Sequence, residues 1–427
     1  MVGSAAQLVV RCRNAAEIAE LISRASRSRV STVIRGGGHG PRWRSAAAMI
    51  VADLTPMRSV SFSDGVATAG AGARVGDVYT VLAEHGRTIP AGRTSSVGIA
   101  GLTLGGGFGI LGRKYGLTCD QLLAAQVVLA DGRVVECDDR HDHELFWALR
   151  GAGCGNFGVV TSLSFRTVRM PAATAFSMTW PCSLTAAVID AWQVWQTAGP
   201  DDLTSSLLVK ADADGCSPTA NLVGIMLGTQ VHARELLSEL TVRVGARPLP
   251  AYCMPFREAK RHPAFTGSEW QQAAAPHVSA SARTANRSEF FRRPLPRQAI
   301  AALVENLIAE RPPDQSRGLY FTSWGGAYNR VREDATAFVH RNETFLLKYE
   351  VSVGSRAGWN DGQRWLARCA DSIRPHGTGG VYPNFPDPSL TDWAYAYYGV
   401  NYERLQRVKQ EYDPMSFFCF PQAIEVP

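Results

Sequence analysis

Glycine is concentrated in three segments of the first 160 residues, and this distribution restricts the folds that the chain can adopt. The segments are Arg35-Gly36-Gly37-Gly38-His39-Gly40, residues 98–116 and residues 151–158. The first follows a predicted strand, Ser31 to Ile34. Because glycine has no side chain, consecutive glycines at a strand end let backbone N–H groups approach a ligand closely. This junction predicts a cradle for an anionic group.

The third glycine segment formally matches the G-x-G-x-x-G pattern of dinucleotide-binding folds, at Gly153, Gly155 and Gly158. In those folds the pattern follows a strand and opens a helix. Here it follows a predicted helix, Glu144 to Leu149, and precedes a strand-like stretch, Val159 to Phe165. The reversed order argues against a Rossmann-type domain.

The charge distribution favours a small anionic ligand over a nucleic acid. The 427 residues include 44 Lys+Arg and 38 Asp+Glu, a net charge of +6, and the basic residues are scattered rather than grouped. A hydrophobic content of 45% predicts a folded globular chain. At roughly 100 to 200 residues per domain, the length allows two or three domains. We expect no nucleic-acid partner.

The chain also lacks the sequence signatures of membrane insertion, secretion and metal binding. No apolar run approaches the ~18 residues that a membrane span requires. The N-terminal segment MVGSAAQLVVRCR has neither a basic start nor a long apolar core, so we expect a cytoplasmic protein with no membrane partner. The nine cysteines are widely spread and never in C-x-x-C spacing. This spacing argues against a disulfide framework and a zinc site, so we expect no metal.

Two local signals predict particular elements in the first part of the chain. Asn14 can cap a helix in which Glu17 sits at the third position and Ile18 begins an apolar repeat. Further on, Asp131-Gly132 separates two strand-like runs. Asp-Gly between such runs predicts a hairpin with a two-residue type I′ turn.

The second part of the chain predicts a separate α+β domain, in which helices cover one face of a sheet. Strand-like and helical segments alternate there, and glycine becomes less frequent after about Met170. The C-terminal residues turn aromatic and polar again, which indicates a return to the first domain. The expected boundaries are 1–170 for the N-terminal part of the first domain, 171–378 for the second domain and 379–427 for the returning segment. The predicted strands of the second domain are Phe176 to Trp180, Leu203 to Val209, Leu319 to Trp324 and Thr344 to Val353, and its predicted helices are Ala186 to Trp195, Arg234 to Arg243, Gln298 to Glu310 and Gly362 to Ser372.

Five motifs occur in order along nearly the whole chain and carry a family resemblance. They are RGGGH ending at His39, the glycine-rich stretch Val97 to Asp120, LFWALRG followed by GNFGVV, AFVHR ending at Arg341, and the terminal YYGxNYxRL and YDP patterns. Together they resemble the FAD-linked oxidases related to berberine bridge enzyme, which have the vanillyl-alcohol-oxidase (PCMH-type) flavoprotein fold. The resemblance implies an α+β protein of two domains: an FAD-binding α+β domain and an antiparallel-sheet substrate domain covered by helices.

The resemblance also implies how FAD is held. The glycine loops would wrap its pyrophosphate, and His39 would bond covalently to the 8α-methyl carbon of the isoalloxazine ring. Many family members add a second link through a cysteine, but Thr94 stands at that position here, so one covalent bond is expected. Val97 matches a position where a small residue leaves room for O2, which implies an oxidase. The other implied cofactor contacts are Arg35, Gly36, Gly37, Gly38, Gly40, Ser95, Gly98, Gly101, Leu102, Gly105, Gly106, Gly109, Val160, Tyr398, Asn401 and Gln422.

Three residues are candidates for the acid–base chemistry. Tyr382 begins a Y-x-N-x-x-D segment that supplies the base in several family members; the alternative is an aromatic wall of the pocket. Lys348 and Glu350 alternate on a predicted strand and so face the same side. They are either a second acid–base group or an ion pair.

The resulting hypothesis is an FAD-dependent oxidase. Its small-molecule substrate, an alcohol, an amine or an activated C–H compound of specialised metabolism, would lose a proton to Tyr382 and a hydride to flavin N5, and O2 would become H2O2. The alternatives are a flavin dehydrogenase or oxidative cyclase, and a binding protein without catalysis.

Three polar residues near residue 285 could reach an acidic substrate or stand on a solvated loop: Arg283, Asn286 and Arg287. The expected partners are the substrate and O2.

Overall fold

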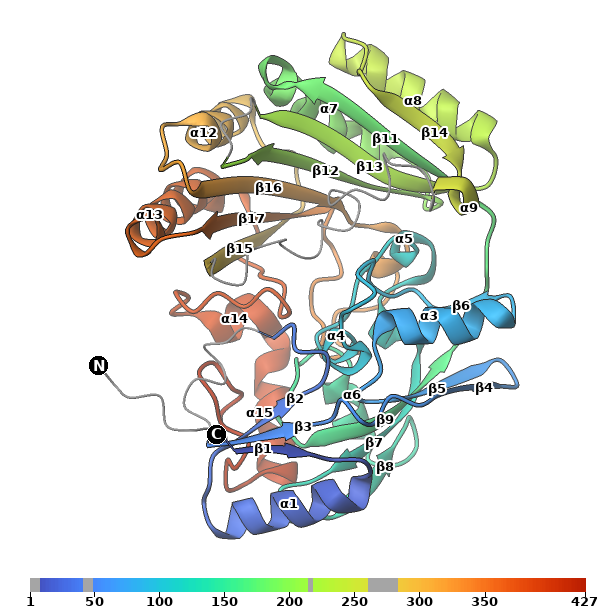
Figure 1. The fold of residues 1–427 in the computed structure, drawn as a ribbon, viewed down its shortest axis with the longest axis vertical. Coiled ribbons are helices and arrows are strands. Elements are labelled where there is room, and N and C mark those ends of the chain that lie inside the picture. The colour runs from blue at the N-terminus through green and yellow to red at the C-terminus, as the bar shows by residue number, and fades with distance from the viewer. Residues whose placement is uncertain (1–7, 41–48, 214–217, 260–282) are drawn as a thin grey trace.

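The computed structural model describes residues 8–40, 49–213, 218–259 and 283–427. Its strands form sheets of three, two, seven and five strands. In Figure 1 the seven-stranded sheet fills the upper part of the molecule and the smaller sheets lie in the lower part. This mixture of helices and sheets confirms the predicted α+β class.

A small parallel sheet opens the chain. Its strand order is β1 (Leu8–Arg11), β3 (Ile50–Asp53) and β2 (Thr32–Arg35), with α1 (Ala15–Arg27) between β1 and β2. The helix begins as predicted, because Asn14 Oδ1 accepts a hydrogen bond from the Glu17 N–H at 2.9 Å. Ile18 and Ile22 are fully buried on the face turned to the core. The glycine loop that follows β2 therefore starts from a well-packed strand.

The five-stranded antiparallel sheet forms the rest of the first core. Its order is β4 (Val60–Ser63), β5 (Val66–Gly70), β9 (Val159–Arg166), β7 (Leu122–Val128) and β8 (Val134–Cys137), and β6 (Arg87–Thr88) pairs with β10 (Val168–Arg169) beside it. The helices of this part are α3 (Val75–Glu84), α4 (Ile99–Leu104), α5 (Gly112–Tyr115) and α6 (His143–Leu149). Buried residues of α1, α3, α4 and α6 share one apolar core with this sheet.

The hairpin between β7 and β8 differs from the predicted turn. A type I′ turn needs a positive φ at both central residues. Only Gly132 has one, at 90°, and the Leu129 N–H donates to the Arg133 carbonyl at 2.9 Å across a longer loop. Asp131 instead accepts a hydrogen bond from the Arg133 N–H at 2.9 Å through Oδ1. The type I′ prediction is therefore wrong. Asp131 does not adopt the positive φ that this turn requires, and its side chain instead bonds to the Arg133 N–H.

The seven-stranded sheet is antiparallel throughout. Across the sheet the strands are β14 (Ala251–Pro255), β11 (Ala173–Pro181), β13 (Thr219–Leu227), β12 (Leu203–Ala211), β16 (Gln315–Ser323), β17 (Phe345–Val353) and β15 (Arg283–Phe291). The sequence did not indicate β13, β14 or β15. Because β15 pairs with β17 along its length, the solvated-loop alternative for Arg283, Asn286 and Arg287 is wrong.

Four helices cover one face of this sheet, as predicted. They are α7 (Thr185–Ala198), α8 (Gln230–Val244), α12 (Arg297–Ile308) and α13 (Arg356–Ile373). Trp192 of α7 and Trp365 of α13 are fully buried between the helices and the strands. The opposite face of the sheet carries Lys348 and Glu350 and is turned toward the glycine loops. Short elements complete the chain: α9 (Phe256–Ala259), and the 3-10 helices Thr118–Gln121, Cys182–Leu184, Gly326–Asn329, Arg374–His376 and Gly399–Asn401.

Two later segments pack against the first core. Phe338, in the loop between β16 and β17, packs against Gly106 and Gly151, and the nearby Arg341 pairs with Asp120 at 2.7 Å with both side chains buried. The C-terminal helices α14 (Trp393–Tyr398) and α15 (Tyr402–Tyr412), red in Figure 1, contribute buried residues to the core of the small sheets. Among the described residues, no helix is both long and apolar enough to cross a bilayer.

Candidate functional site

A cavity of about 510 Å³ lies between the glycine loops and the uncovered face of the large sheet. Segments far apart in the chain line it: residues 31–40, 92–102, 108–110, 154–160, 382–386 and 418–421, with side chains from β12, β13 and β16. Among the described residues that line it there is no aspartate or glutamate. The cavity therefore suits an anionic ligand.

The first two glycine loops touch each other at the wall of this cavity. A Cβ atom on Gly37 would lie 2.2 Å from the Gly98 nitrogen, and one on Gly98 would lie 2.4 Å from the Gly37 nitrogen. No side chain fits at either position. This contact explains why glycine is required in both loops, and it brings two sets of backbone N–H groups to one cavity.

His39 lies at the end of the first loop and lines the cavity. Its Nε2 is 3.0 Å from the Ser96 hydroxyl, in the second loop. Loss of solvent around the ring and the nearby positive charge of Arg74 lower the pKa of His39. A neutral imidazole keeps a lone pair on one ring nitrogen, as bond formation to a carbon electrophile requires.

Thr94 lines the same wall, and its hydroxyl has no hydrogen-bond partner in the described part of the chain although Oγ1 is buried. A buried polar atom without a partner costs stability unless a ligand satisfies it. Thr94 thus marks a point where a bound molecule would be held by a hydrogen bond.

Tyr382 lines the cavity from the side of the C-terminal segment and is almost fully buried. Its Oη accepts hydrogen bonds from the Gly107 N–H and from Asn384 Nδ2, both at 3.0 Å. Asn384 Nδ2 also donates to the Leu102 carbonyl at 3.0 Å, and a Cβ on Gly105 would collide with the Asn384 amide. Burial raises the pKa of Tyr382, and the two N–H donors offset part of this effect.

Lys348 and Glu350 meet each other but lie outside the lining of the cavity. Lys348 Nζ is 3.0 Å from Glu350 Oε2, with both residues buried. The ammonium also lies 4.3 Å from the ring centroid of Tyr320 and 5.3 Å from that of Phe385, which does line the cavity. Burial and the neighbouring Glu350 raise the pKa of Tyr320. The pair therefore lies behind Phe385.

Two family models match separate parts of the chain. The FAD binding domain model matches residues 6–138, and the model described as berberine and berberine like matches residues 381–425. The FAD-linked oxidoreductase YgaK of Bacillus subtilis is 32% identical to this chain, over 98% of this chain and 90% of that protein. This chain belongs to the berberine bridge enzyme-like family of FAD-linked oxidoreductases.

Other family members are also similar to this chain over most of its length. Chitooligosaccharide oxidase of Gibberella zeae is 28% identical over 96% of this chain and 85% of that protein. The solved structure of berberine bridge enzyme from Eschscholzia californica has a TM-score of 0.87 at 23% identity, covering 100% of this chain and 91% of that one. The likeness in structure confirms the two-domain flavoprotein fold that the motifs implied.

The structure places most of the cofactor contacts implied for this family on the cavity wall. Two glycines and one serine are not part of the lining. Gly105 packs against Asn384, Gly106 has a φ of 106° and packs against Phe338, and the Ser95 carbonyl accepts a hydrogen bond from the Gly76 N–H at 3.0 Å. The contacts that line the cavity are Arg35, Gly36, Gly37, Gly38, His39, Gly40, Thr94, Val97, Gly98, Gly101, Leu102, Gly109 and Val160.

Three C-terminal residues of the berberine bridge enzyme-like motifs also lie behind the wall, where they hydrogen-bond to backbone carbonyls. Tyr398 Oη donates to Ala152 at 2.8 Å. Asn401 Nδ2 donates to Glu333 at 2.8 Å, and Gln422 Nε2 donates to Asp387 at 2.8 Å. In this structure they hold loops together rather than line the cavity.

Several lining residues were missed by the sequence reasoning. Gly155 and Gly158 belong to the third glycine segment, and its resemblance to a phosphate-binding pattern was the available signal. The sheet residues had no signal, because which face of a strand points to the cavity depends on the assembled sheet. The missed lining residues include Arg93, Thr204, Ser206 and Thr322.

The charged residues suggested for an acidic substrate are not at the cavity. Arg287 pairs with Asp387 at 3.3 Å, and both side chains are largely buried. The Asn286 Oδ1 atom is buried without a hydrogen-bond partner among the described residues. The Arg287–Asp387 pair ties β15 to the Y-x-N-x-x-D segment that begins at Tyr382.

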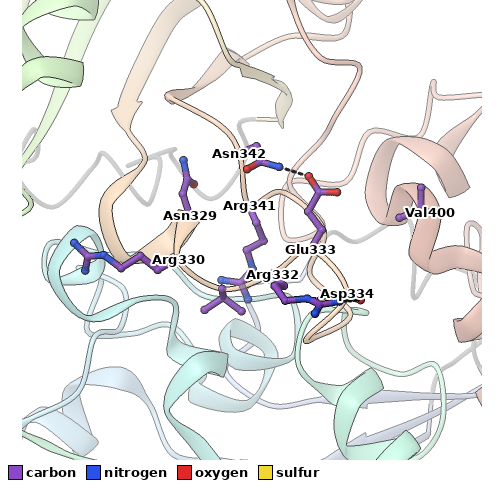
Figure 2. Close-up of a pocket in the computed structure, with 9 residues that line it drawn as sticks. Asn329, Arg330, Arg332, Glu333, Asp334, Arg341, Asn342 and Val400 are labelled. Carbon is purple, nitrogen blue, oxygen red and sulfur yellow. Dashed lines mark hydrogen bonds and ion pairs between the residues drawn. The ribbon is translucent and has the colours of Figure 1, made fainter.

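A second hollow, of about 540 Å³, lies at loop residues 329–334, 341, 342 and 400. Figure 2 shows that Glu333 contacts Asn342 and that Arg332 pairs with Asp334. Glu333 also pairs with Arg292, at 3.9 Å. Arg330 likewise pairs with Asp201. The charges of this hollow are already neutralised, so the cavity at the glycine loops is the better candidate site.

Glu289 on β15 supports the loop that leads to Tyr382, and it should make the stability of the protein depend on pH. Its Oε1 accepts a hydrogen bond from the Gly379 N–H at 2.7 Å, and burial raises its pKa from 4.5 to about 7. The folded state therefore binds this proton more tightly than the unfolded state. The contribution of Glu289 to the free energy of unfolding is therefore complete below pH 4.5, and it is lost as the pH rises through about 7.

We expect Glu289→Gln to remove this dependence. At pH 8 the variant should be more stable than the wild type by about 3 kcal/mol, and at pH 4.5 the two should be equal. Urea-induced unfolding at both pH values measures the difference. Glu305→Gln, at an exposed site on α12, is the matched control and should change neither value. Parallel pH profiles for the wild type and Glu289→Gln would contradict the prediction.

Proposed function

We propose that this protein is an oxidase that transfers a hydride from an alcohol, an amine or an activated C–H compound to N5 of bound FAD, with O2 reduced to H2O2. The observation that carries the proposal is the contact between Gly37 and Gly98, which places two glycine loops and His39 on one cavity. The family supplies the class of cofactor, and its named members include oxidases of small-molecule substrates.

The residues present fit FAD. The cavity has no carboxylate among its described lining residues, and it carries glycines where a Cβ atom would block the wall. We propose that the first two glycine loops bind the pyrophosphate, that His39 forms the single covalent bond, and that the Thr94 hydroxyl hydrogen-bonds to the ring system. Thr94 has an unpaired buried oxygen in the described chain, which supports this role.

Tyr382 is the proposed base. It lines the cavity, and its Oη is held in place by the two hydrogen bonds from Gly107 and Asn384. These donors stabilise the phenolate, the form that accepts a proton from the substrate. Lys348 and Glu350 are proposed as positioning residues, because their ion pair lies behind Phe385 and supports that wall.

Val97 supports the oxidase assignment over a dehydrogenase or an oxidative cyclase. It lines the cavity with only a small aliphatic side chain beside Gly98. A small residue at this position leaves room for O2 near the reacting atoms. Release of one H2O2 for each substrate oxidised would support an oxidase, whereas turnover only with an artificial electron acceptor would support a dehydrogenase.

The attachment through His39 can be tested by acid precipitation. The wild type should be yellow, with absorbance near about 450 nm, and the colour should stay with the precipitate because the bond is covalent. His39→Ala should bind FAD but release it into the supernatant, since the variant has no imidazole nitrogen at this position.

His141→Ala is the matched control. His141 is exposed and pairs with Asp138 at 3.0 Å, so its loss should leave the flavin covalently bound. Flavin that stays attached in His39→Ala would show that another residue forms the bond. A colourless wild-type protein would overturn the oxidase proposal and favour a binding protein.

A further inference from the structure

Arg93 lies directly before Thr94 and lines the cavity, yet its charge is unbalanced. Within the described part of the chain, its guanidinium makes no hydrogen bond and no ion pair, and its side chain is half-buried. By contrast, the other arginine of the lining, Arg35, pairs with Asp53 at 3.0 Å. Among the described residues, Arg93 is therefore a cation of the lining without a counter-charge.

This arrangement leaves the Arg93 guanidinium available to a ligand in the cavity. Burial lowers the pKa of Arg93 to about 10, so the group is still charged at neutral pH. A guanidinium that lines the cavity and has no partner among the described residues can form charge-assisted hydrogen bonds with an anion bound there. No aspartate or glutamate is available among the described lining residues, so a negative charge must come with the ligand.

Three hydroxyl groups on the sheet face the same cavity. Thr204 and Ser206 lie on β12, and Thr322 lies on β16 directly opposite Ser206 in the register. In the described structure these side-chain hydroxyls make no hydrogen bond with other protein groups. The wall across from the glycine loops thus offers hydrogen-bond donors and acceptors and no charge of its own.

The position of Arg93 indicates a ligand other than the phosphates of FAD. It lies three residues before Ser96, whose hydroxyl contacts His39. His39 is the proposed attachment point of the isoalloxazine ring, and the pyrophosphate is proposed to lie at the glycine loops. A guanidinium on the same cavity wall as Thr94 is available to the molecule that reacts there.

We propose that Arg93 recognises a carboxylate on the substrate, and that Thr204, Ser206 and Thr322 bind its remaining polar groups. The inference rests on the proposed function, because it takes the ring end of the cavity as the place where substrate binds. The planar guanidinium matches a carboxylate with two parallel hydrogen bonds, which a neutral analogue cannot reproduce. The substrate class is therefore a carboxylated small molecule.

Benzoate and benzamide provide the test, because they share a shape and differ in charge. Isothermal titration calorimetry on the purified full-length protein should show benzoate binding at least about tenfold more tightly than benzamide. Arg93→Met should abolish this preference, and Arg93→Lys should restore part of it. Arg330→Met, which removes an equal charge outside the cavity, should leave the preference unchanged.

The flavin content of each variant, measured in parallel, separates the two possible sources of the anion. An Arg93→Met protein with full flavin content and no benzoate preference would support the substrate role. Loss of FAD from Arg93→Met with the benzoate preference intact would assign Arg93 to the cofactor phosphates and overturn the inference. Equal binding of both probes by the wild type would also overturn it. A wild type without flavin would overturn the proposed function alone, since calorimetry does not require the flavin.

Discussion

Replacing Tyr382 by Phe is expected to lower kcat/KM by about 10²–10⁴, the usual contribution of a positioned proton acceptor. The substitution removes only the oxygen that accepts hydrogen bonds from Gly107 and Asn384. The ring would keep its edge contacts with Phe108 and Phe385, whose centroids lie 5.1 and 5.0 Å away. Packing should therefore survive while proton transfer is lost.

The pH profile gives Tyr382 a signature that a structural role would not. Burial raises its pKa, so the phenolate is the minor form at neutral pH. The kcat/KM of the wild type should rise with pH through the alkaline range as this form becomes populated, and Tyr382→Phe should lack that rise. Steady-state kinetics by H2O2 release between pH 7 and about 10 would measure both effects.

Tyr328→Phe is the matched control for this experiment. Tyr328 is also a buried tyrosine, and its Oη contacts the Gly109 backbone, but it does not line the cavity. Its loss should leave kcat/KM and the pH profile within a few-fold of the wild type. If Tyr382→Phe retained more than a tenth of the activity, Tyr382 would be an aromatic wall of the pocket and the base would lie elsewhere.

Gly98→Ala is expected to reduce the flavin content to less than about a tenth of the wild type. The new Cβ atom would lie 2.4 Å from the Gly37 nitrogen, which is closer than any real Cβ contact. Because the obstacle is backbone, no side chain can rotate away, and the two loops must separate. The cradle proposed for the FAD pyrophosphate would open.

The ratio of flavin absorbance to protein absorbance after gel filtration measures this loss, and circular dichroism checks that the variant is folded. Gly354→Ala is the control, since a Cβ there meets its nearest neighbour at 3.5 Å, an ordinary contact, outside the cavity lining. A folded Gly98→Ala protein with full flavin content would show that the contact between the loops is not required for the cofactor.

Features that depend on a short stretch of chain could be predicted from the sequence. Asn14 caps α1, because the cap and its partner Glu17 are three residues apart. Lys348 and Glu350 form an ion pair, because alternate residues of a strand share a face. The local arrangement of both pairs follows from backbone geometry alone.

Features that depend on distant segments could not be predicted. β15 was missed because it pairs with β17, from which it is separated along the chain by α12, β16 and the 3-10 helix Gly326–Asn329. The contact of Gly37 with Gly98 and the position of Asn384 against Gly105 likewise join parts of the chain far apart in sequence. Such contacts depend on the packing of the whole core, so no short sequence motif predicts them.

The sequence by itself determined the family, the α+β class and the glycine loops, because ordered motifs and backbone requirements are written in consecutive residues. Only the tertiary structure decided which motif residues reach the cavity. It placed Tyr382 on the wall and put Tyr398 and Asn401 behind it, although all belong to C-terminal motifs. Within the described residues, it also left the Arg93 guanidinium on the cavity wall without an ion pair. Exposure to a cavity and the balance of charge are properties of the assembled surface, so they appear only when the segments have come together.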